Sequence, residues 1–450
     1  MRNCFSFVAG WAVLLHALGI ATPLTAQEGD LPAQPPPIPR AFIGAKIFPI
    51  GAPEIENGTL LIRGDRIIAV GPADQVRIPD DAWQVDVRGK VIMPGLVDTH
   101  SHIGGGWGGD SSSPIQPDVR ILDSINVRDS GFRKAQAGGL TTLNVMPGSG
   151  HLLSGQTIYM KNKRGRTIED VVIRDPAGNI LGGIKMANGT NSHREPPFPA
   201  TRAKSAALVR QKFVKAQEYR RKLEKGREDP EKMPERDLEM EALVEVLERR
   251  WVVHHHTHRN DDIVTVLRLA REFGFKVVLH HVSEGWKVAE EIAAADVPCS
   301  IILVDSPGGK IEAMNLIMET GGVLERTGVL TAFHTDDPIT DSRLFLRMAA
   351  LGVRAGMSRE KALEALTIAG AKMLDLDHRI GSLEPRKDAD FIILTGDPLS
   401  VYTKVQQTWI DGELVFDLDN PDDRLFAVGG YGAGKDQAMH LCCFGPHGHD

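Results

Sequence analysis

The sequence predicts an α/β protein: a parallel (β/α)8 barrel of the TIM type with a small β domain formed from both ends of the chain. Three observations predict this architecture. Between residues 93 and 380, eight candidate strands alternate with helical segments, which is typical of a parallel sheet covered by helices. On either side, residues 41–92 and 381–417 consist of short β-rich runs broken by turn residues. The length of 450 residues accommodates one barrel of about 250 residues beside a smaller domain.

The first 26 residues have the pattern of an export signal. Arg2 supplies a positive start, residues 5–20 are nearly all apolar, and small residues precede Gln27. Because this apolar run is shorter than the roughly 20 residues of a spanning helix, we expect cleavage after residue 26 and a periplasmic or secreted protein without a membrane contact. An uncleaved membrane anchor is the alternative. Residues 27–40 are rich in proline and predict an extended linker.

The two β-rich flanks share the same pattern of short strands separated by turns. The run GTLLIRGDRIIAVG carries a hairpin signal at Gly64 and Asp65, and similar runs return near the other end as DADFIILTGDPL and VQQTWIDGELVFD. We therefore expect residues 41–92 and 381–417 to pair into one β domain that brackets the central insert. Residues 418–450 are left as a tail.

The central insert supplies the strands and helices of the barrel. A helix is predicted over residues 260–274, with Asn260 or Asp261 as its cap and Gly274 as its stop. Its apolar face consists of Ile263, Val266, Leu267 and Ala270. The candidate strands, in chain order, are GLVDTH, TTLNVMP, GQTIYMK, NILGGIKM, RWVVHHH, KVVLHH, PCSIILV and VLTAFHT.

Residues 203–250 are highly charged and predict two helices separated by a break that contains proline. Val209, Phe213 and Ala216 can form one buried stripe, which leaves the lysines and arginines on an outer face. We expect that face to be solvated, because the second helix is acidic. Recognition of an acidic partner is the alternative.

The composition limits the function. The chain has 42% hydrophobic and 25% charged residues, as globular proteins do, and its net charge of −7 gives no electrostatic footprint for nucleic acid. We expect a small-molecule substrate and leave self-association open. Four cysteines, of which three remain after signal cleavage, do not describe a disulfide framework: Cys4, Cys299, Cys442 and Cys443.

Histidines recur where the candidate strands end. His100 and His102 share one face of the first strand, so their imidazoles can converge on one metal ion. An isolated pair of this kind is more often a pair of polar loop residues. Its repetition favours a metal site, because active sites of such barrels lie at the carboxyl ends of the strands. The further strand-end residues are His254, His255, His256 and His258, then His280 and His281, and finally His334 and Asp336.

From residue 41 to about residue 417 the chain resembles the amidohydrolase superfamily, specifically its imidazolonepropionase-like branch. The stretches that carry the resemblance, in family order, are VIMPGLVDTHSHIG, AQAGGLTTLNVMPGSGHLLSGQ, GGIKMANGTN, HHHTHRNDDI, VVLHHVSEGWKVAE, LTAFHTDDP and ALTIAGAKMLDLDHRIGSLEPRKDADFIILTGDPL. The resemblance implies a (β/α)8 barrel over residues 93–380, a β-sandwich from residues 41–92 and 381–417, and hydrolysis of carbon–nitrogen bonds at zinc or another divalent metal, with one or two ions.

The resemblance also implies the ligand set, and Asp336 as the proton shuttle. On the fifth strand His258 shares a face with His256 and competes with it. On the sixth strand the alternation of side chains places His280 and His281 on opposite faces, and the resemblance selects His281. We expect at least two of the spare histidines to orient the ligands. The implied metal ligands are His100, His102, His256, His281 and Asp336.

Lys185 ends the fourth candidate strand. Related amidohydrolases carboxylate a lysine on this strand and use it to bridge two metals, so a carboxylated Lys185 is one prediction. The other is an ordinary lysine that forms a salt bridge or binds substrate. Lys161, which ends the third strand, is a weaker candidate for the bridge.

The segment after Lys185 predicts substrate contacts from Asn191, His193 and Arg202, with a solvated loop as the alternative. This segment departs from the family pattern, as do Arg386 and the histidine-rich run HHHTHR, so the sequence does not select among amides, dipeptides and cyclic amides. Two other functions stay open. One is an amidohydrolase-like scaffold without activity, and the other is a periplasmic metal-binding protein, suggested by HHHTH and the terminal HGHD.

Overall fold

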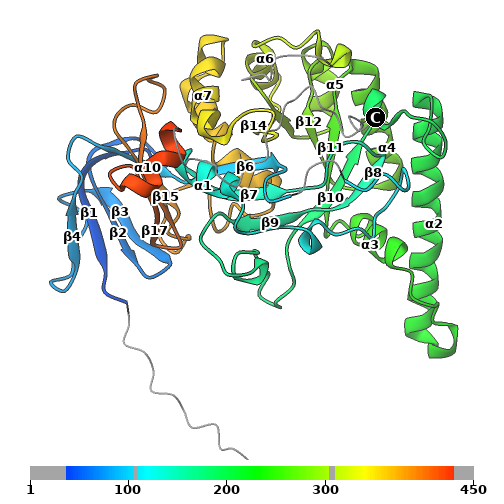
Figure 1. Ribbon diagram of the computed structural model, residues 1–450, viewed down its shortest axis with the longest axis horizontal. Helices are drawn as coiled ribbons and strands as arrows, with labels where there is room; N and C mark the ends of the chain where they lie inside the picture. Colours follow the sequence, from blue (N-terminus) through cyan, green and yellow to red (C-terminus); the bar gives the residue numbers. More distant parts are fainter. Residues whose placement is uncertain (1–36, 106–108, 304–309, 430–450) are drawn as a thin grey trace, which may run out of the picture. The chain divides into compact units, whose positions relative to one another are not determined.

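The computed structural model describes residues 37–105, 109–303 and 310–429 (Figure 1). The predicted signal, residues 27–36 of the predicted linker and residues 430–450 of the predicted tail lie outside the described residues. The described chain belongs to one compact unit that starts at Pro37. Its helices include none that is both long and apolar enough to cross a membrane.

Strands from both ends of the chain hydrogen-bond in one sheet (Figure 1). Its order is β17-β16-β15-β5-β1-β2-β3, and β4 pairs with β1. The junction between the two chain ends is antiparallel, with Phe391 opposite Pro94 and Leu394 opposite Val91. The strands are β1 (Arg40–Ile47), β2 (Ile55–Arg63), β3 (Arg66–Pro72), β4 (Trp83–Asp86), β5 (Val91–Pro94), β15 (Phe391–Leu394), β16 (Val405–Ile410) and β17 (Glu413–Asp417).

Aromatic packing joins the two chain ends of this sheet. The ring of Phe42 lies edge-on to Phe391 and Trp409, with centroid distances of 4.9 Å and 5.1 Å. These three side chains are buried with aliphatic residues from β1, β2 and β5. The predicted hairpin is present between β2 and β3, where Gly64 adopts a φ of 58° that suits glycine in a tight turn.

The remaining strands form two further sheets. One has the order β14-β13-β12-β11-β10-β8, parallel except at β8, and the other has the order β6-β7-β9. A parallel bridge between Ser101 and Asp337 connects β6 to the segment after β14. The fold is therefore mixed α/β, and closure into a single eight-stranded barrel stays a prediction. The strands are β6 (Leu96–Ser101), β7 (Leu140–Val145), β8 (Leu153–Gln156), β9 (Ile158–Lys161), β10 (Gly183–Ala187), β11 (Val252–Thr257), β12 (Val277–His281), β13 (Cys299–Ile301) and β14 (Thr331–Phe333).

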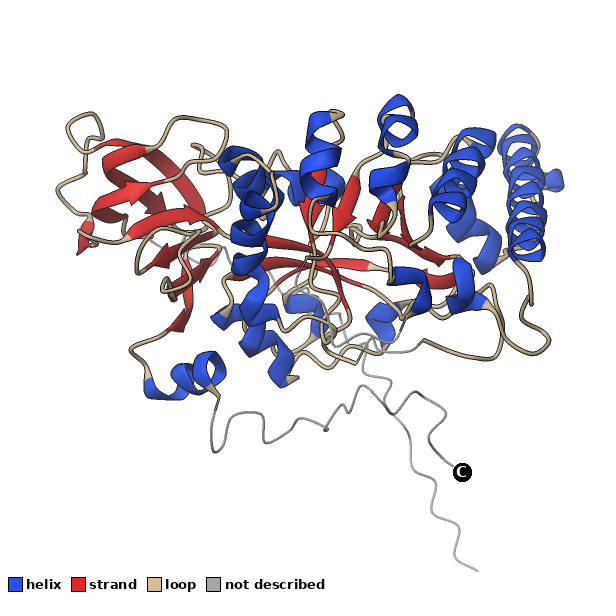
Figure 2. Ribbon diagram, turned by 90° about the horizontal axis from the view of Figure 1, so that it is seen from above, coloured by secondary structure: helices blue, strands red, loops and turns tan. Residues whose placement is uncertain are grey.

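Helices flank the central strands (Figure 2). The two predicted charged helices are present as α2 and α3, and α2 buries the expected Val209, Phe213 and Ala216. Phe213 stacks on Phe273 and Phe275, with centroid distances of 5.1 Å and 5.2 Å. The helices are α1 (Ser130–Ala137), α2 (Arg202–Glu228), α3 (Leu238–Leu247), α4 (Asn260–Phe273), α5 (Ala289–Ala294), α6 (Thr320–Arg326), α7 (Phe345–Arg354), α8 (Arg359–Ala365), α9 (Ile368–Met373) and α10 (Pro421–Val428).

Helix α4 corrects two details of its prediction. It begins at Asn260 after Arg259, whose side chain makes no capping bond, and Leu269 rather than Leu267 completes the buried face. The backbone N–H of Asn260 instead donates to the carboxylate of Glu284, in the loop after β12, at 3.1 Å. The helix ends as predicted at Gly274, which has a φ of 77°.

The predicted tail also differs from the expectation, because residues 421–428 form α10. Asn420 caps this helix by accepting from the N–H of Asp422, and Pro421 occupies its first turn. Arg133 of α1 pairs with Asp423 at 2.6 Å and stacks over Phe426 at 4.0 Å. These contacts attach the start of the predicted tail to α1.

Candidate metal centre

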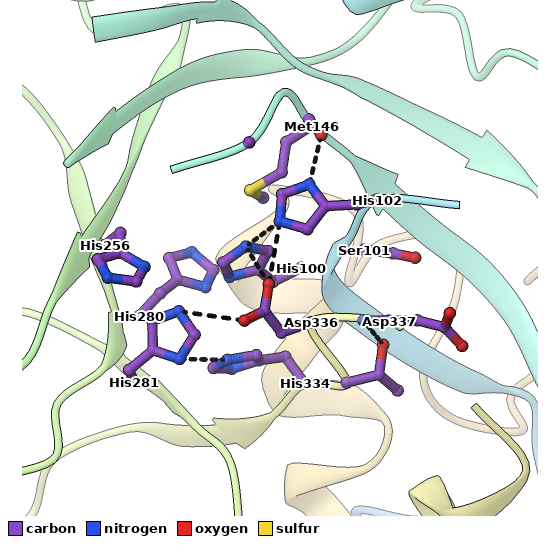
Figure 3. Close-up of polar contacts among 12 residues, drawn as sticks. His100, Ser101, His102, Met146, His256, His280, His281, His334, Asp336 and Asp337 are labelled. Carbon is purple, nitrogen blue, oxygen red and sulfur yellow. Dashed lines mark hydrogen bonds and ion pairs between the residues drawn. The ribbon is translucent and has the colours of Figure 1, made fainter. Parts of the chain in front are cut away.

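The two histidines at the end of β6 point at one carboxylate (Figure 3). His100 Nε2 and His102 Nε2 lie 3.2 Å apart, and they lie 3.1 Å and 3.0 Å from Asp336 Oδ1. All three residues come from strand ends, because Asp336 follows β14 and its backbone N–H donates to the carbonyl oxygen of His100. The structure thus brings together three of the predicted ligands.

The hydrogen bonds around His102 indicate that a cation fits between these side chains. His102 Nδ1 lies 2.8 Å from the carbonyl oxygen of Met146, which can only accept, so we assign the proton to Nδ1 and a lone pair to Nε2. That lone pair faces the oxygen of Asp336. Two electron-rich atoms in contact are stabilised by a positive charge between them. Orientation of a ligand histidine by a backbone carbonyl is also the usual arrangement at metal sites.

Asp336 is held in its ionised form. Burial alone would raise the pKa of its carboxyl group, but the contact with His102 and the charge of Lys185 lower it well below its usual range. The backbone of Asp336 has a φ of 51°, in the left-handed region, which aspartate tolerates better than most residues. An ionised carboxylate is suited to bind a cation.

His280 and His281 both contact the site, so the prediction that only one of them faces it is wrong. The ring centroids lie 4.9 Å and 5.1 Å from that of His100. Alternation fails because the backbone turns at the end of β12, where His281 has a φ of 70° and Val282 a φ of 48°. The strand rule that separates consecutive side chains holds only while the chain stays extended.

His334 lies beside His281, and its Nε2 is 3.3 Å from His281 Nδ1. Its other ring nitrogen lies 2.8 Å from Ser300 Oγ. Two sets of three residues around this site each have their ligand atoms within 4.8 Å of one another. One set is His100, His102 and Asp336, and the other is His100, His280 and His334. The second set contains two histidines that the sequence analysis placed outside the ligand set.

Lys185 of β10 is fully buried beside these rings. Its Nζ lies 2.9 Å from His100 Nε2 and 3.1 Å from Met146 Sδ. Burial lowers the pKa of the Lys185 ammonium to about 7, although the charge of Asp336 opposes this effect. An amine with this pKa is partly neutral near neutral pH.

His256 and His258 share a second cation, the ammonium of Lys310. Lys310 Nζ lies 3.2 Å from His256 Nε2 and 3.3 Å from His258 Nε2. The ring of His256 is 4.3 Å from that of His281, and the ring of His258 is 5.0 Å from it, so both histidines of β11 and its following loop border the site. The choice between them as ligand therefore stays open.

His254, from the same strand, lies among buried polar side chains. Its Nε2 lies 3.0 Å from the hydroxyl of Tyr159 and its Nδ1 lies 3.1 Å from His280 Nε2. Burial lowers the pKa of the imidazoles of His254, His258 and His334 to about 3. These three rings are therefore neutral near pH 7, the form in which histidine binds a metal.

The predicted substrate residues have different surroundings. Asn191 reaches the site, because its Nδ2 lies 3.1 Å from His256 Nε2. His193 Nε2 is buried and has no hydrogen-bond partner among the residues that the structure describes. The guanidinium of Arg202 forms ion pairs with Asp262, at 2.9 Å, and with Glu312. Its charge is therefore engaged within the protein, and the described structure does not bring it to the histidines.

Lys161, the weaker candidate for the metal bridge, lies in a different cluster. Its Nζ contacts Asp388, Asp390 and Asp411 at 2.8 Å, 2.6 Å and 3.1 Å. The three carboxylates raise the pKa of its ammonium despite burial, which keeps it charged. An ammonium among three acids is a structural ion cluster, so the structure removes Lys161 from the candidate bridging residues.

Sequence reasoning missed three contributors: Met146, Ser300 and Lys310. Met146 lies in the stretch TTLNVMPG and supplies a backbone carbonyl, for which a sequence has no side-chain signal. Ser300 lies within the short strand β13. Lys310 follows a glycine pair and has no motif around it that indicates a position in the site.

Comparison with known proteins identifies the family of the chain. Residues 249–416 match the amidohydrolase family. The crystal structure of an amidohydrolase from Thermotoga maritima is 34% identical and has a TM-score of 0.78, with 84% of this chain and 100% of that chain covered.

Two curated relatives were also found. The amidohydrolase TasK of Hapsidospora irregularis is 29% identical over 77% of this chain, but the match spans only 38% of that protein. The imidazolonepropionase of Fusobacterium nucleatum is 21% identical over 80% of this chain and 92% of that protein. The chain belongs to the amidohydrolase superfamily.

Proposed function

We propose that this protein is a metal-dependent hydrolase of carbon–nitrogen bonds in amides, dipeptides or cyclic amides. One observation carries the proposal: Asp336 Oδ1 lies within 3.1 Å of both His100 Nε2 and His102 Nε2, in a buried cluster of imidazoles. The family relatives support the hydrolase class, since amidohydrolases and deaminases act on carbon–nitrogen bonds.

The ion is zinc or another divalent metal, bound as one or two ions. Its ligands are His100, His102, His256, His281 and Asp336. When bound there, such an ion polarises a carbonyl group and lowers the pKa of water from about 16 to about 7. His102 is oriented for this role by the carbonyl of Met146.

Asp336 accepts the proton of the attacking water and returns it to the leaving nitrogen. Its lowered pKa keeps the carboxylate ionised, so that its oxygens are free of protons when the water arrives. The new carbon–oxygen bond replaces the carbon–nitrogen bond, so one water is consumed and an acid and an amine are released. Asn191 and His193 contact the substrate in this proposal. Arg202 contacts it only if its pairs with Asp262 and Glu312 open.

Lys185 is proposed to be carboxylated and to bridge two metals. A carbamate forms only from a neutral amine, and burial among His100 and Met146 favours that form. The alternative is a neutral lysine that donates to His100. The Lys185→Ala protein should bind fewer metal equivalents if the carbamate bridges, and a short-chain carboxylate should partly restore its activity.

The same proposal includes the architecture. The sheets that contain β6 to β14 are taken as the wall of a (β/α)8 barrel over residues 93–380, and the sheet from residues 41–92 and 381–417 as a β-sandwich domain. Residues 1–26 are proposed as a cleaved signal for a periplasmic or secreted protein. Mass spectrometry of the protein purified from its native host tests the cleavage, because the mature chain should begin at Gln27.

The test of function is a substrate screen with dipeptides, N-acyl amino acids and cyclic ureides, with and without a chelator. Wild-type protein should hydrolyse at least one class, and chelation should abolish that activity. Asp336→Asn should fold normally and lose at least about a hundredfold in rate, whereas the exposed Asp74→Asn control should not. Bound metal without hydrolysis would favour the inactive scaffold, and metal uptake that depends on the terminal HGHD would favour a metal-binding protein.

A further inference from the structure

We propose that Lys310, together with Asn191, binds a carboxylate on the leaving group of the substrate, so that the preferred substrates are N-acyl amino acids or dipeptides. This inference rests on the proposed function, because it names the substrate class of the same site. It assigns a specificity role to a lysine in the segment after β13.

Two hydrogen-bond donors converge on one nitrogen atom. Lys310 Nζ lies 3.2 Å and Asn191 Nδ2 lies 3.1 Å from His256 Nε2. A neutral imidazole offers a single lone pair, so His256 cannot fully satisfy both donors. Lys310 also contacts His258 Nε2, whose ring is held by Ser283 Oγ at 2.7 Å.

A metal ion on His256 would change the partners of both donors. A cation that takes the lone pair of Nε2 removes the acceptor that Lys310 and Asn191 share. Asn191 Nδ2 would then lose this acceptor, and Lys310 would keep only its contact with His258 Nε2, so both donors could donate to an additional oxygen partner. One carboxylate can accept from an ammonium and an amide together, and charge-assisted hydrogen bonds of this kind are stronger than neutral ones.

The protein does not supply that acceptor from its described residues. Among residues 37–105, 109–303 and 310–429, no carboxylate forms an ion pair with Lys310. Glu312 is only two residues away, but its oxygens accept from the backbone N–H of Thr190 at 3.0 Å and pair with Arg202. The partners of the Lys310 ammonium in the described structure are therefore the neutral acceptors His256 and His258, which a carboxylate ligand could replace.

The place of Lys310 favours a substrate carboxylate over the oxyanion of the reaction. Lys310 is exposed, and so are Ile311 and Met314, at 82% and 75% of their surfaces. His100 and Lys185, by contrast, are fully buried. The lysine thus approaches from the rim, where the group beyond the scissile nitrogen would lie if the carbonyl is activated in the interior.

The experiment compares a dipeptide with the same dipeptide carrying a neutral carboxamide at its end. Lys310→Met should raise KM for the dipeptide by about 10- to 100-fold, which is the loss expected for a hydrogen bond to a charged group. The kcat for the dipeptide and the KM for the carboxamide substrate should change little. Lys310→Arg should retain most of the preference for the carboxylate. Lys215→Met removes an exposed lysine of α2 and serves as the charge control.

A loss of kcat that is equal for both substrates would instead indicate contact with the oxyanion and would overturn the inference. Calorimetric binding of leucine and leucinol to the metal-loaded protein decides the matter without turnover. Wild-type protein should bind leucine more tightly, and Lys310→Met should remove the difference. Absence of hydrolysis with retained leucine preference would refute only the proposed function, whereas equal binding of the two ligands would refute the role of Lys310.

Discussion

Replacing Glu284 with glutamine should lower the free energy of unfolding at neutral pH by up to about 3 kcal/mol, and this loss should shrink as the pH falls. Glu284 lies in the loop after β12, three residues beyond His281. Its carboxylate accepts from the backbone N–H and the side-chain amide of Asn260, at 3.1 Å and 2.6 Å, from Lys287 at 2.8 Å and from Asn315 at 2.5 Å. It therefore fixes the start of α4 against the loop that carries His281.

The magnitude follows from the proton affinity of Glu284. Burial alone would raise the pKa of its carboxyl group, but the hydrogen bonds from Lys287, Asn260 and Asn315 lower it from the ordinary 4.5 to about 2. Each tenfold change in proton affinity corresponds to about 1.4 kcal/mol, which gives about 3 kcal/mol. A group with a lowered folded pKa stabilises the protein above the unfolded pKa of 4.5, and this contribution is lost as the pH falls through about 2.

The assay is urea unfolding of wild-type and Glu284→Gln protein between about pH 7 and pH 3. The difference between the two proteins should be largest at pH 7 and fall to about 1.4 kcal/mol at pH 3. Glu218→Gln makes the same chemical change on an exposed position of α2 and should alter stability little at any pH. A Glu284→Gln protein as stable as wild type at pH 7, or a difference independent of pH, would refute the reasoning.

Three further predictions concern packing, buried charge and metal. Phe213→Ala should lower the free energy of unfolding in urea by about 3–5 kcal/mol, because it removes the ring stacked on Phe273 and Phe275. Val214→Ala, at an exposed position of the same helix, should lower it far less, and equal effects would contradict the packing of α2 against these rings. Lys161→Met should cost about 3–5 kcal/mol because it leaves the buried carboxylate of Asp390 without its ion-pair partner. Burial raises the pKa of Asp390 to about 6 even with Lys161 present, and removing the lysine raises it further, so the cost should decrease as the pH falls toward about 6. A cost that grows on acidification would contradict this prediction. Removing a metal present at a hundred times its Kd should reduce stability by about 2.7 kcal/mol in calorimetric melting, and an unchanged Tm after chelation would argue against a bound ion.

The parts of the site on extended backbone could be predicted from the sequence. His100 and His102 lie near each other because the alternation of β6 holds up to its last residue, Ser101. Side chains at turns could not be placed in this way. The positive φ of His281 brings a second histidine of β12 to the cluster, and no local sequence pattern specifies that backbone angle.

Long-range partners account for the remaining differences. Arg202 looked available for substrate because its two acids, Asp262 and Glu312, are 60 and 110 residues away in the chain. Lys310 and Asn191 meet at His256 although they come from separate loops. For the fold, the order of strands along the chain and the presence of the helices α2 and α3 followed from periodicity. The division of the strands among sheets depends on hydrogen bonds between distant segments.

The central claim is that the cluster around Asp336 is a metal centre, and the metal content of the purified full-length protein tests it most directly. Elemental analysis should give one or two equivalents of zinc or another divalent metal per chain. Substituting His100 and His102 together with alanine should remove most of it, while His378→Ala, a change outside the site, should not. Protein that is folded by circular dichroism, remains free of metal after dialysis against zinc and loses nothing on the double substitution would contradict the account.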